Sequence, residues 1–353
     1  MISIRTLVLA LVLAAPAFAQ VKVCPSTAAS DTITIAGSTT VQPIAITWGA
    51  AYTAQCKAKV TVEGGGSSDG AKRVCGDTSK GAAVDIGAMS RAWKSTEATV
   101  STGGFTYKCL IGTKPSVIQI DVAIDGLTVI IKKSSLPDVC IKALGGLTFA
   151  QLRWIFSSYT VAKLTATGWS ASALANSDGS DKTHLFSEIS ASCPKTEIKL
   201  IGPGSTFGSY TYFLETILTD FAKGETFDLL RPSGAAYKST TTDSATVTAV
   251  KGDSAAIGFV SYSAFDKNKA TVSAASIKYK AGFVVPSSTT IAAGTYPLSR
   301  RIFMNLLSTT VAKTKAIIEY GMSAKGTADV ISNDYSPIPA TSRATQKAKL
   351  SIA

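Results

Sequence analysis

The sequence is poor in the residues that build most catalytic and metal centres. It has a single histidine, His184, so a histidine-rich metal centre and a Ser-His-Asp triad built around several candidates are nearly excluded. No Cys-x-x-Cys pair occurs, which leaves a zinc ribbon or a thioredoxin-type site without support. Beyond the start of the chain, no apolar run reaches the roughly 20 residues that a membrane crossing needs.

Charge is also scarce. Only 16% of the 353 residues are charged, and 35 Lys and Arg against 23 Asp and Glu leave a formal charge of +12. The hydrophobic content of 46% argues against disorder, and the length favours two globular domains. The basic residues are scattered, with no basic run interleaved with aromatics, so nucleic acid is not expected as a partner. Such a surface more plausibly steers anions toward a site.

Residues 1–19 have the layout of a secretory signal peptide. Arg5 precedes an apolar run over residues 7–15, and Pro16 and small residues follow it. We predict cleavage before Gln20, a mature charge of +11 because Arg5 is lost, and a periplasmic or secreted location. A signal anchor is the alternative, but the apolar run is short for one. Cys24 is not preceded by the small residue of a lipoprotein cysteine, so a lipid anchor is disfavoured.

Six cysteines remain after this cleavage, and an even count in an exported chain predicts three disulfides. The sequence does not choose among the 15 pairings that six cysteines allow. Free buried thiols are the alternative. The cysteines are Cys24, Cys56, Cys75, Cys109, Cys140 and Cys193.

Short β-branched segments alternate with helical patterns, which predicts α/β lobes built on parallel sheets. The predicted strands are residues 32–36, 59–63, 83–87, 116–120, 127–132, 197–201 and 256–262. The predicted helices are residues 41–54, 148–156, 209–221 and 299–307. Residues 157–194, dense in Ser, Thr, Asn, Gly and Asp, are predicted to form a long surface loop.

Three turns rich in glycine and hydroxyl residues link a predicted strand to a predicted helix. They lie at residues 37–40, 64–70 and 202–209. Unpaired N–H groups and the positive end of the helix dipole favour an anion at such a place. Each turn alone is better explained by ordinary capping, but the presence of three such turns favours an uncharged, hydroxyl-lined anion site. None has the spacing of a Walker loop or a dinucleotide fingerprint.

The chain resembles the phosphate-binding proteins of phosphate ABC transporters. It looks most like the branch with a Ser-Arg pair and a Gly-Pro-Gly turn, often called the SphX type. The motifs that carry the resemblance, in the order found in that family, are GSTTVQP at 37–43, GGGSSDGAKR at 64–73, VDIGAMSRAWK at 84–94, VAIDGLTVII at 122–131, LTFAQLRWIF at 147–156, LIGPGSTFGSYTYF at 200–213, AAIGFVSYSAF at 255–265 and YPLSRRIFM at 296–304.

The resemblance implies a periplasmic-binding-protein type II fold, in which two α/β lobes are joined by a hinge of two crossings. The crossings are expected near residues 122–128 and 257–262. Lobe 1 is then residues 31–121 plus 263–353, and lobe 2 is the inserted segment 122–262. The ligand is held in the cleft, and hinge closure presents the protein to membrane permease subunits. We expect a monomer without cofactor or metal.

The resemblance also implies ligand residues. The hydroxyls of Thr39 and Ser67 and the backbone N–H of Thr40 are expected to bind phosphate, with Ser38 beside them. In the third turn Gly208 offers N–H and Ser209 a hydroxyl, although Phe207 departs from the pattern unless Ser205 or Thr206 replaces its hydroxyl.

Arg91 is expected to pair two phosphate oxygens, because an arginine follows Ser90 where the best-known branch has an aspartate. The alternative is a solvated surface arginine. That missing aspartate accepts the proton of phosphate, so discrimination against sulfate is expected to weaken. Asp69 and Asp85 are candidate replacements, more often caps or structural residues, and Arg231 and Asp243 are further candidates near the cleft.

Two other functions remain open. A phosphatase would need a nucleophile or metal cluster beside the anion site, which this chain lacks in sequence. No catalytic residue is therefore expected. A binding protein for another tetrahedral oxyanion, such as sulfate, molybdate or phosphonate, would use the same hydroxyl-lined site.

Overall fold

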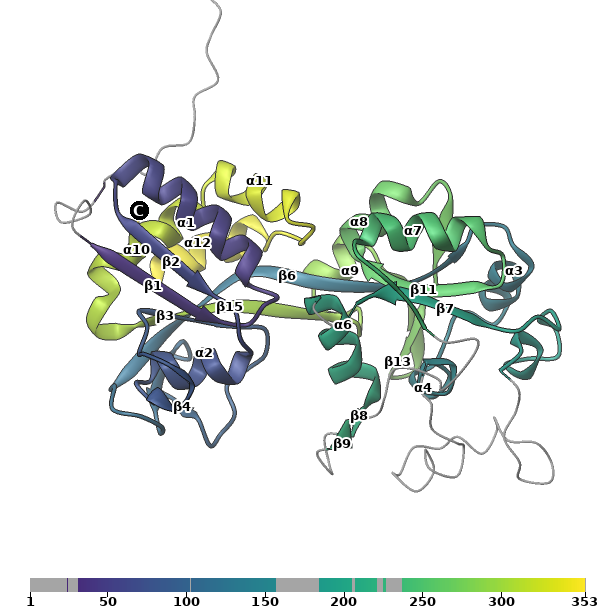
Figure 1. Ribbon diagram of the computed structural model, residues 1–353, viewed down its shortest axis with the longest axis horizontal. Coiled ribbons are helices and arrows are strands. Elements are labelled where there is room, and N and C mark those ends of the chain that lie inside the picture. Colours follow the sequence, from purple (N-terminus) through teal and green to yellow (C-terminus); the bar gives the residue numbers. More distant parts are fainter. Residues whose placement is uncertain are drawn as a thin grey trace, which may run out of the picture.

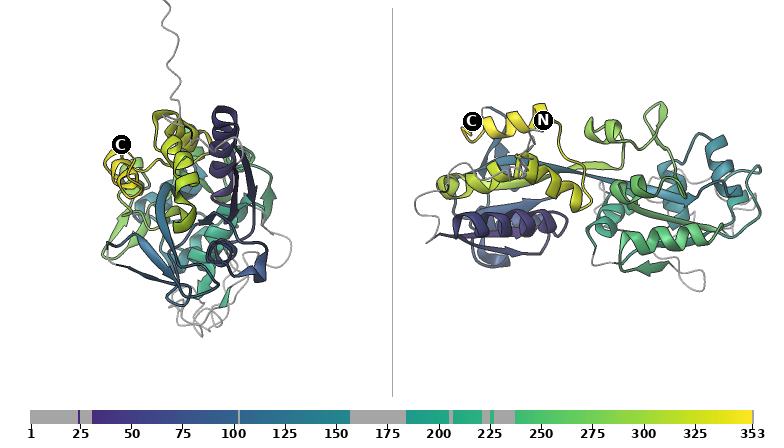
Figure 2. Two further views of the ribbon diagram at one scale, coloured as in Figure 1. Left: turned by 90° about the vertical axis from the view of Figure 1, so that its left-hand side faces the viewer. Right: turned by 90° about the horizontal axis from the view of Figure 1, so that it is seen from above.

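The computed structural model describes Cys24 and residues 31–101, 103–156, 184–204, 207–220, 225–226 and 237–352. The predicted signal peptide, most of the predicted loop at 157–194, Ser205, Thr206 and Arg231 lie outside these residues. Two α/β lobes lie side by side and are joined by two strands that run between them (Figure 1, Figure 2). No helix within the described residues is long and apolar enough to cross a membrane.

Lobe one is built on a mixed sheet whose buried faces are covered by helices. Its strands are β1 (Thr32–Gly37), β2 (Lys59–Glu63), β3 (Ile86–Met89), β4 (Ala98–Val100), β5 (Thr106–Cys109), the first part of β6 (Ser116–Lys132) and β15 (Ser299–Leu307). Its helices are α1 (Gln42–Cys56), α2 (Ser67–Val74), the 3-10 turns η2 (Thr78–Lys80) and η6 (Ser308–Thr310), α10 (Val311–Gly321), α11 (Ala324–Ser332) and α12 (Ala340–Ala348).

Lobe two uses the remainder of β6 in a second set of strands. Its strands are β7 (Lys199–Pro203), β10 (Lys238–Thr240), β11 (Ala256–Ser261) and β12 (Val272–Ala274), with the pairs β8 (Thr219–Asp220) with β9 (Glu225–Thr226) and β13 (Ile277–Tyr279) with β14 (Gly282–Val284). Its helices are α3 (Leu136–Ala143), α4 (Phe149–Phe156), the 3-10 turn η4 (Phe186–Glu188), α6 (Gly208–Phe213) continued by the π-helix η5 (Leu214–Leu218), α7 (Asp243–Gly252), α8 (Tyr262–Asn268) and α9 (Ser288–Ala292).

Strand β6 is shared by the lobes, and its pairing partner changes halfway along. Up to Gly126 it pairs with β15, and from Leu127 it pairs with β11. Leu127 N–H donates to the carbonyl of Leu298, 2.8 Å away, where the chain returns to lobe one. The two crossings therefore lie side by side, at Gly126 and Leu127 and at Leu298 and Ser299.

Three sequence predictions differ from this arrangement. The segment 299–307 was predicted to be helical, but it is the central strand β15, hydrogen-bonded to β6 on one side and β3 on the other. The two strands predicted at 116–120 and 127–132 form one continuous strand, because β15 and β11 hold its two halves extended. The return crossing lies after residue 262, since β12 still pairs with the lobe-two half of β6, so residues 263–298 belong with lobe two.

Three disulfides are present, as the cysteine count predicted. Cys24 is bonded to Cys56 at the end of α1, Cys75 to Cys109, and Cys140 to Cys193. The described residues leave no free cysteine. Two of these bonds brace lobe one and the third braces lobe two.

Candidate functional site

A cavity of about 410 Å³ opens between the lobes, at the level of the two crossings. Pockets of this size commonly hold small ligands. Both lobes and the hinge strand β6 contribute to its wall. The residues that line it are Thr39, Thr40, Gln42, Pro43, Asp125, Phe207, Gly208, Ser209, Thr242, Asp243, Ser261, Asn333, Asp334 and Tyr335.

The lobe-one wall is the amino-terminal end of α1. Strand β1 ends at Gly37, whose φ of +135° and close approach to the Ala88 carbonyl leave no room for a side chain. The turn that follows places Thr39 and Thr40 at the start of α1. This end has no acidic residue in its first turn and no capping side chain, so the positive end of its dipole is not neutralised and favours an anion. The N–H groups of Val41 and Gln42 are already bonded to the Ser38 carbonyl, so the hydroxyls of Thr39 and Thr40 are the donors that this end offers.

The lobe-two wall is the start of α6, on the side of lobe two that faces lobe one (Figure 1). Stacking of Phe213 on Phe259 of β11, with ring centroids 4.1 Å apart, fixes α6 against the sheet. Gly208 and Ser209 thereby face the cavity. Gly208 lies directly against Thr40, because a Cβ at position 208 would fall 2.6 Å from Thr40 Oγ1. The lobes are therefore in contact at this point.

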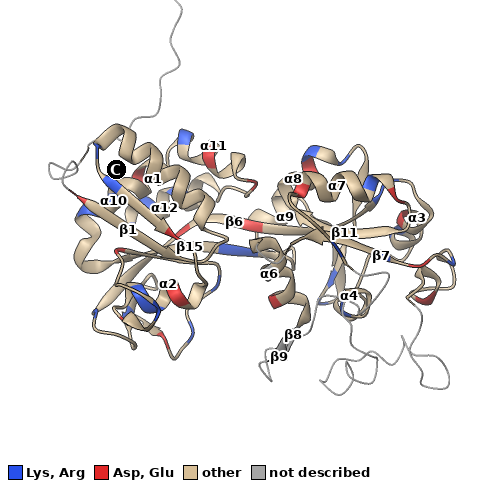
Figure 3. Cartoon of the chain, in the orientation of Figure 1, with Lys and Arg blue, Asp and Glu red and all other residues tan. Residues whose placement is uncertain are grey.

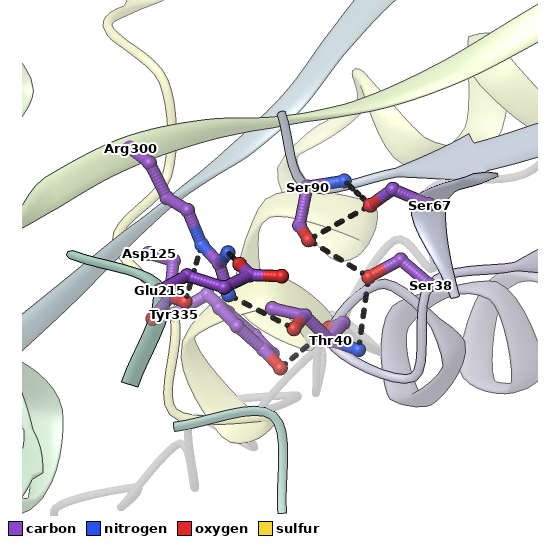
Figure 4. A network of polar contacts seen from close by, with 8 residues as sticks. All are labelled: Ser38, Thr40, Ser67, Ser90, Asp125, Glu215, Arg300 and Tyr335. Atoms are coloured by element: carbon purple, nitrogen blue, oxygen red, sulfur yellow. Dashed lines mark hydrogen bonds and ion pairs between the residues drawn. The ribbon is translucent and has the colours of Figure 1, made fainter. Parts of the chain in front are cut away.

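A chain of three serine hydroxyls lies beside the α1 end (Figure 4). Ser38 Oγ donates to Ser90 Oγ at 2.9 Å, and Ser67 Oγ lies 3.2 Å from Ser90 Oγ. Ser38 Oγ also accepts the N–H of Thr40 at 3.3 Å, and Ser67 Oγ accepts the N–H of Ser90 at 3.0 Å. Ser38 and Ser67 do not line the cavity, and the N–H of Thr40 is directed at Ser38. These hydroxyls join the turn before α1, the start of α2 and the end of β3.

Three carboxyl groups line the same cavity. Burial raises the pKa of Asp125, although its ion pair with Arg300 opposes the rise. Burial also raises the pKa of Asp243, whose Oδ2 accepts the N–H of Ser261 at 2.9 Å. Asp334 is paired with Lys267 at 2.8 Å. Asp243, a lower-ranked candidate in the sequence, is thus placed at the cavity with a raised pKa.

Arg300 of β15 is a residue that sequence reasoning missed. Its guanidinium contacts Asp125 and Thr40, two of the cavity residues, with N···O distances of 3.2 and 3.1 Å (Figure 4). Figure 3 shows this basic stretch of β15 beside acidic positions of β6. The available signal was a pair of arginines at the start of a largely apolar segment, SRRIFMNLL.

Arg91 does not line this cavity, so its expected role as the guanidinium on the ligand stays a prediction. Its two terminal nitrogens form a fork with Glu97, at 2.8 and 2.9 Å, and one of them also donates to Ser68 Oγ. Although burial alone would raise it, the pKa of Glu97 is lowered by the hydrogen bonds from Arg91 and from the N–H of Lys94. A carboxylate six residues downstream therefore neutralises Arg91.

The remaining candidates have structural surroundings. Asp85 accepts from the N–H and the hydroxyl of Thr34 and pairs with Lys313, and Asp69 lies in the first turn of α2. His184 stacks on Trp154, with centroids 4.5 Å apart. Within the described residues, no group of three His, Cys, Asp or Glu is placed to hold a metal ion.

Comparison with known proteins identifies the family. The model of the PBP superfamily domain matches residues 23–325. The chain belongs to the PBP superfamily. Among curated PBP relatives, protein SphX of Synechococcus elongatus is 28% identical over 276 residues, which cover 77% of this chain and 67% of SphX. The phosphate-binding protein PstS of Staphylococcus epidermidis is 26% identical over 142 residues, 40% of each chain.

Solved structures confirm the PBP fold. A possible phosphate binding protein from Planctomyces limnophilus superposes with a TM-score of 0.67 at 23% identity, over 91% of this chain and 97% of that one. An ABC-type phosphate transport receptor from Vibrio cholerae gives a TM-score of 0.57 at 21% identity, over 87% and 100%. The expected type II fold is thereby confirmed. The names of PstS and of these two solved structures describe binding or reception, in agreement with the expectation that the chain is not an enzyme.

Proposed function

We propose that this PBP superfamily member captures inorganic phosphate between its lobes and delivers it to an ABC permease. The observation that carries the proposal is the position of the cavity, between the amino-terminal end of α1 in lobe one and the start of α6 in lobe two. An anion there touches both lobes and so stabilises their contact. The phosphate-related names of the relatives support the choice of anion.

The ligand donors in this proposal are uncharged. Thr39 and Thr40 offer hydroxyls at the α1 end, and Gly208 and Ser209 offer backbone N–H and hydroxyl from lobe two. Ser38 and Ser67 hold these donors in place through the serine chain. Arg91 is not included, because its guanidinium is already paired with Glu97.

The ionised form of Asp243 supplies the acceptor for the proton that phosphate carries, and because burial raises the pKa of Asp243 this form is more available at about pH 8 than at about pH 5. Asp243 lines the cavity, and its Oδ2 accepts a hydrogen bond from the N–H of Ser261. Its position in the chain differs from that of the aspartate in the best-known branch. A buried acceptor discriminates against an anion that has no proton to donate, such as sulfate. Asp243→Asn is expected to reduce the preference for phosphate over sulfate by about tenfold.

Delivery to a permease outside the cytoplasm fits three features of the chain. The amino terminus resembles a signal peptide, the described cysteines are all in disulfides, and the relative from Vibrio cholerae is named as a transport receptor. The chain acts as a monomer in this proposal, and its excess of basic residues draws anions toward the cleft.

Calorimetric titration of the mature protein with phosphate, sulfate and molybdate, at about pH 5 and about pH 8, tests the proposal. We expect phosphate to bind at micromolar concentration or below. No binding of phosphate tighter than about millimolar, roughly −4 kcal/mol, would overturn it. Tight binding of sulfate or molybdate alone would assign the same cavity to another oxyanion.

Matched variants locate the site. Thr39→Val and Ser209→Ala remove one hydroxyl from each wall and are expected to weaken phosphate binding by about tenfold each. Thr345→Val in α12, an exposed threonine that donates to the Thr341 carbonyl, is the control and should bind as the wild type does. Equal affinities for all of these proteins would place the ligand elsewhere.

A further inference from the structure

Arg300 lies where both lobes and both crossing strands meet. It lies one residue after Ser299, at the start of β15, and is paired in register with Asp125 of β6. Only 12% of its side chain is exposed to solvent. It is therefore a largely buried cation at the hinge, beside the cavity.

Its guanidinium has partners in three different parts of the fold (Figure 4). Nε donates to Asp125 Oδ2 on the hinge strand at 3.2 Å, and Nη2 donates to Thr40 Oγ1 of lobe one at 3.1 Å. In lobe two, Nη1 donates to Glu215 Oε2 at 3.2 Å, and the guanidinium carbon lies 3.9 Å from the centre of the Tyr212 ring. One side chain thus ties the α1 end to the α6 and η5 segment across the cleft.

We infer that Arg300 is an interlobe latch, which holds the lobes together and directs the Thr40 hydroxyl at the bound anion. Thr40 and Glu215 belong to different lobes, so a rotation about the crossings would separate them. While the Arg300 guanidinium stays bonded to Asp125, it cannot keep its contacts with both Thr40 and Glu215 once these two residues move apart. The contacts of Arg300 therefore exist together only when the lobes meet, as they do where Gly208 touches Thr40.

The second part of the inference follows from hydrogen-bond polarity. A guanidinium donates and never accepts, so Thr40 Oγ1 is an acceptor toward Arg300 and its own O–H remains free to donate. Tyr335 Oη donates to the Thr40 carbonyl at 2.6 Å and fixes the residue from the other side. The Thr40 hydroxyl is left with a proton to give to an oxyanion in the cavity.

Arg300 is a positioning residue in this scheme and not a direct ligand. It does not line the cavity, and its charge already faces the carboxyl groups of Asp125 and Glu215. This part of the inference rests on the proposed function, because it needs an anion in the cavity. The latch itself does not, since its contacts join the lobes without ligand.

Glu215→Gln tests the latch most directly, because it removes the lobe-two ion pair without altering a cavity residue. In small-angle X-ray scattering of the ligand-free protein, we expect this variant to have a larger radius of gyration than the wild type. Phosphate should return it to the wild-type value, with an affinity about three- to tenfold lower. The control is Arg301→Gln, whose arginine pairs with Asp121 at 2.5 Å and is 43% exposed.

Arg300→Gln tests the link to Thr40, and we expect phosphate affinity to fall by more than tenfold. The double variant with Glu215→Gln should bind phosphate with an affinity within twofold of that of Arg300→Gln, since both changes break the same contact.

If Arg300→Gln does not fold, Glu215→Gln still tests whether the latch exists. The latch would be overturned if Glu215→Gln had the same ligand-free radius of gyration and the same phosphate affinity as Arg301→Gln and the wild type. If the wild type binds no phosphate, the proposed function fails, while the ligand-free scattering still tests the latch.

Discussion

Thr40 of lobe one and Gly208 of lobe two touch across the cleft, and the contact leaves no room for a methyl group. An added Cβ at position 208 would lie 2.6 Å from Thr40 Oγ1 and 3.0 Å from Thr40 Cα. Backbone as well as side chain is involved, so a rotamer change of Thr40 cannot relieve the clash. The lobes reach this distance only because residue 208 is glycine.

Gly208→Ala is therefore expected to hinder closure. Because closure brings the α6 donors to the anion, phosphate affinity should fall by at least tenfold, about 1.4 kcal/mol. The measurement is calorimetric titration alongside Gly252→Ala, a glycine at the end of α7 whose added Cβ meets no atom within 4 Å. Equal affinity of the two variants would show that the lobes need not approach this closely to bind.

The fork between Arg91 and Glu97 predicts that Arg91 matters more for stability than for binding. Arg91→Ala leaves the carboxylate of Glu97, only 11% exposed, without its cation, and we expect a loss of about 1–3 kcal/mol in the free energy of unfolding. Adding Glu97→Gln to Arg91→Ala should recover part of the lost free energy of unfolding. Phosphate affinity should change by less than tenfold. A larger loss of affinity would restore Arg91 as a ligand.

The same pair has a pH dependence. The pKa of Glu97 is held below its ordinary value, so its stabilisation is present at neutral pH and is lost as the pH falls through that lowered pKa. The stability difference between the wild type and Arg91→Ala should therefore narrow in acid. Urea titrations at about pH 7 and about pH 3 measure it. An unchanged difference would show that packing, and not charge, holds Arg91.

The disulfide between Cys75 and Cys109 is predicted to support lobe one without shaping the cavity. It joins the end of α2 to β5 and closes a loop with a sequence separation of 34, for which chain entropy gives about 3–4 kcal/mol. The double variant Cys75→Ala with Cys109→Ala should lose about that much stability but bind phosphate within threefold of the wild type. A much larger loss of affinity would connect α2 to the ligand more directly.

The parts of the site that the sequence predicted are local in the chain. Thr39, Thr40, Gly208 and Ser209 follow a strand and open a helix, and this strand, turn and helix order is visible in adjacent residues. Arg300 was missed because its partners are remote: Asp125 lies 175 positions away and Thr40 260. No local pattern reports such a pairing.

The error at residues 299–307 has a related cause. Most of β15 is buried, because it is a central strand between β6 and β3 and helices α2 and α10 pack against it, so its sequence does not alternate between apolar and polar residues. Periodicity cannot separate such a strand from a buried helix. The position of the return crossing was also missed. Residues 263–298 are placed in lobe two by the pairing of β12 with β6, a contact between remote segments that no local pattern reports.

Asp243 should make the protein less stable as the pH rises. Its pKa is raised by burial, with the charges of Asp334 and Asp125 adding to the rise, so the native state keeps this proton to a higher pH than the unfolded chain, where the pKa is about 3.9. The stability of the folded protein therefore falls as the pH rises from the pKa of Asp243 in the unfolded chain to its pKa in the native state. Asp243→Asn, which carries no charge, should gain in melting temperature relative to the wild type as the pH rises above about 4, and melting curves recorded between about pH 4 and about pH 8 measure this gain. Asp253→Asn is the opposite control, because the hydrogen bond from Lys199 lowers the pKa of Asp253 and its removal should be most harmful at high pH. Parallel melting curves for Asp243→Asn and the wild type across this range would mean that Asp243 remains ionised in the cavity.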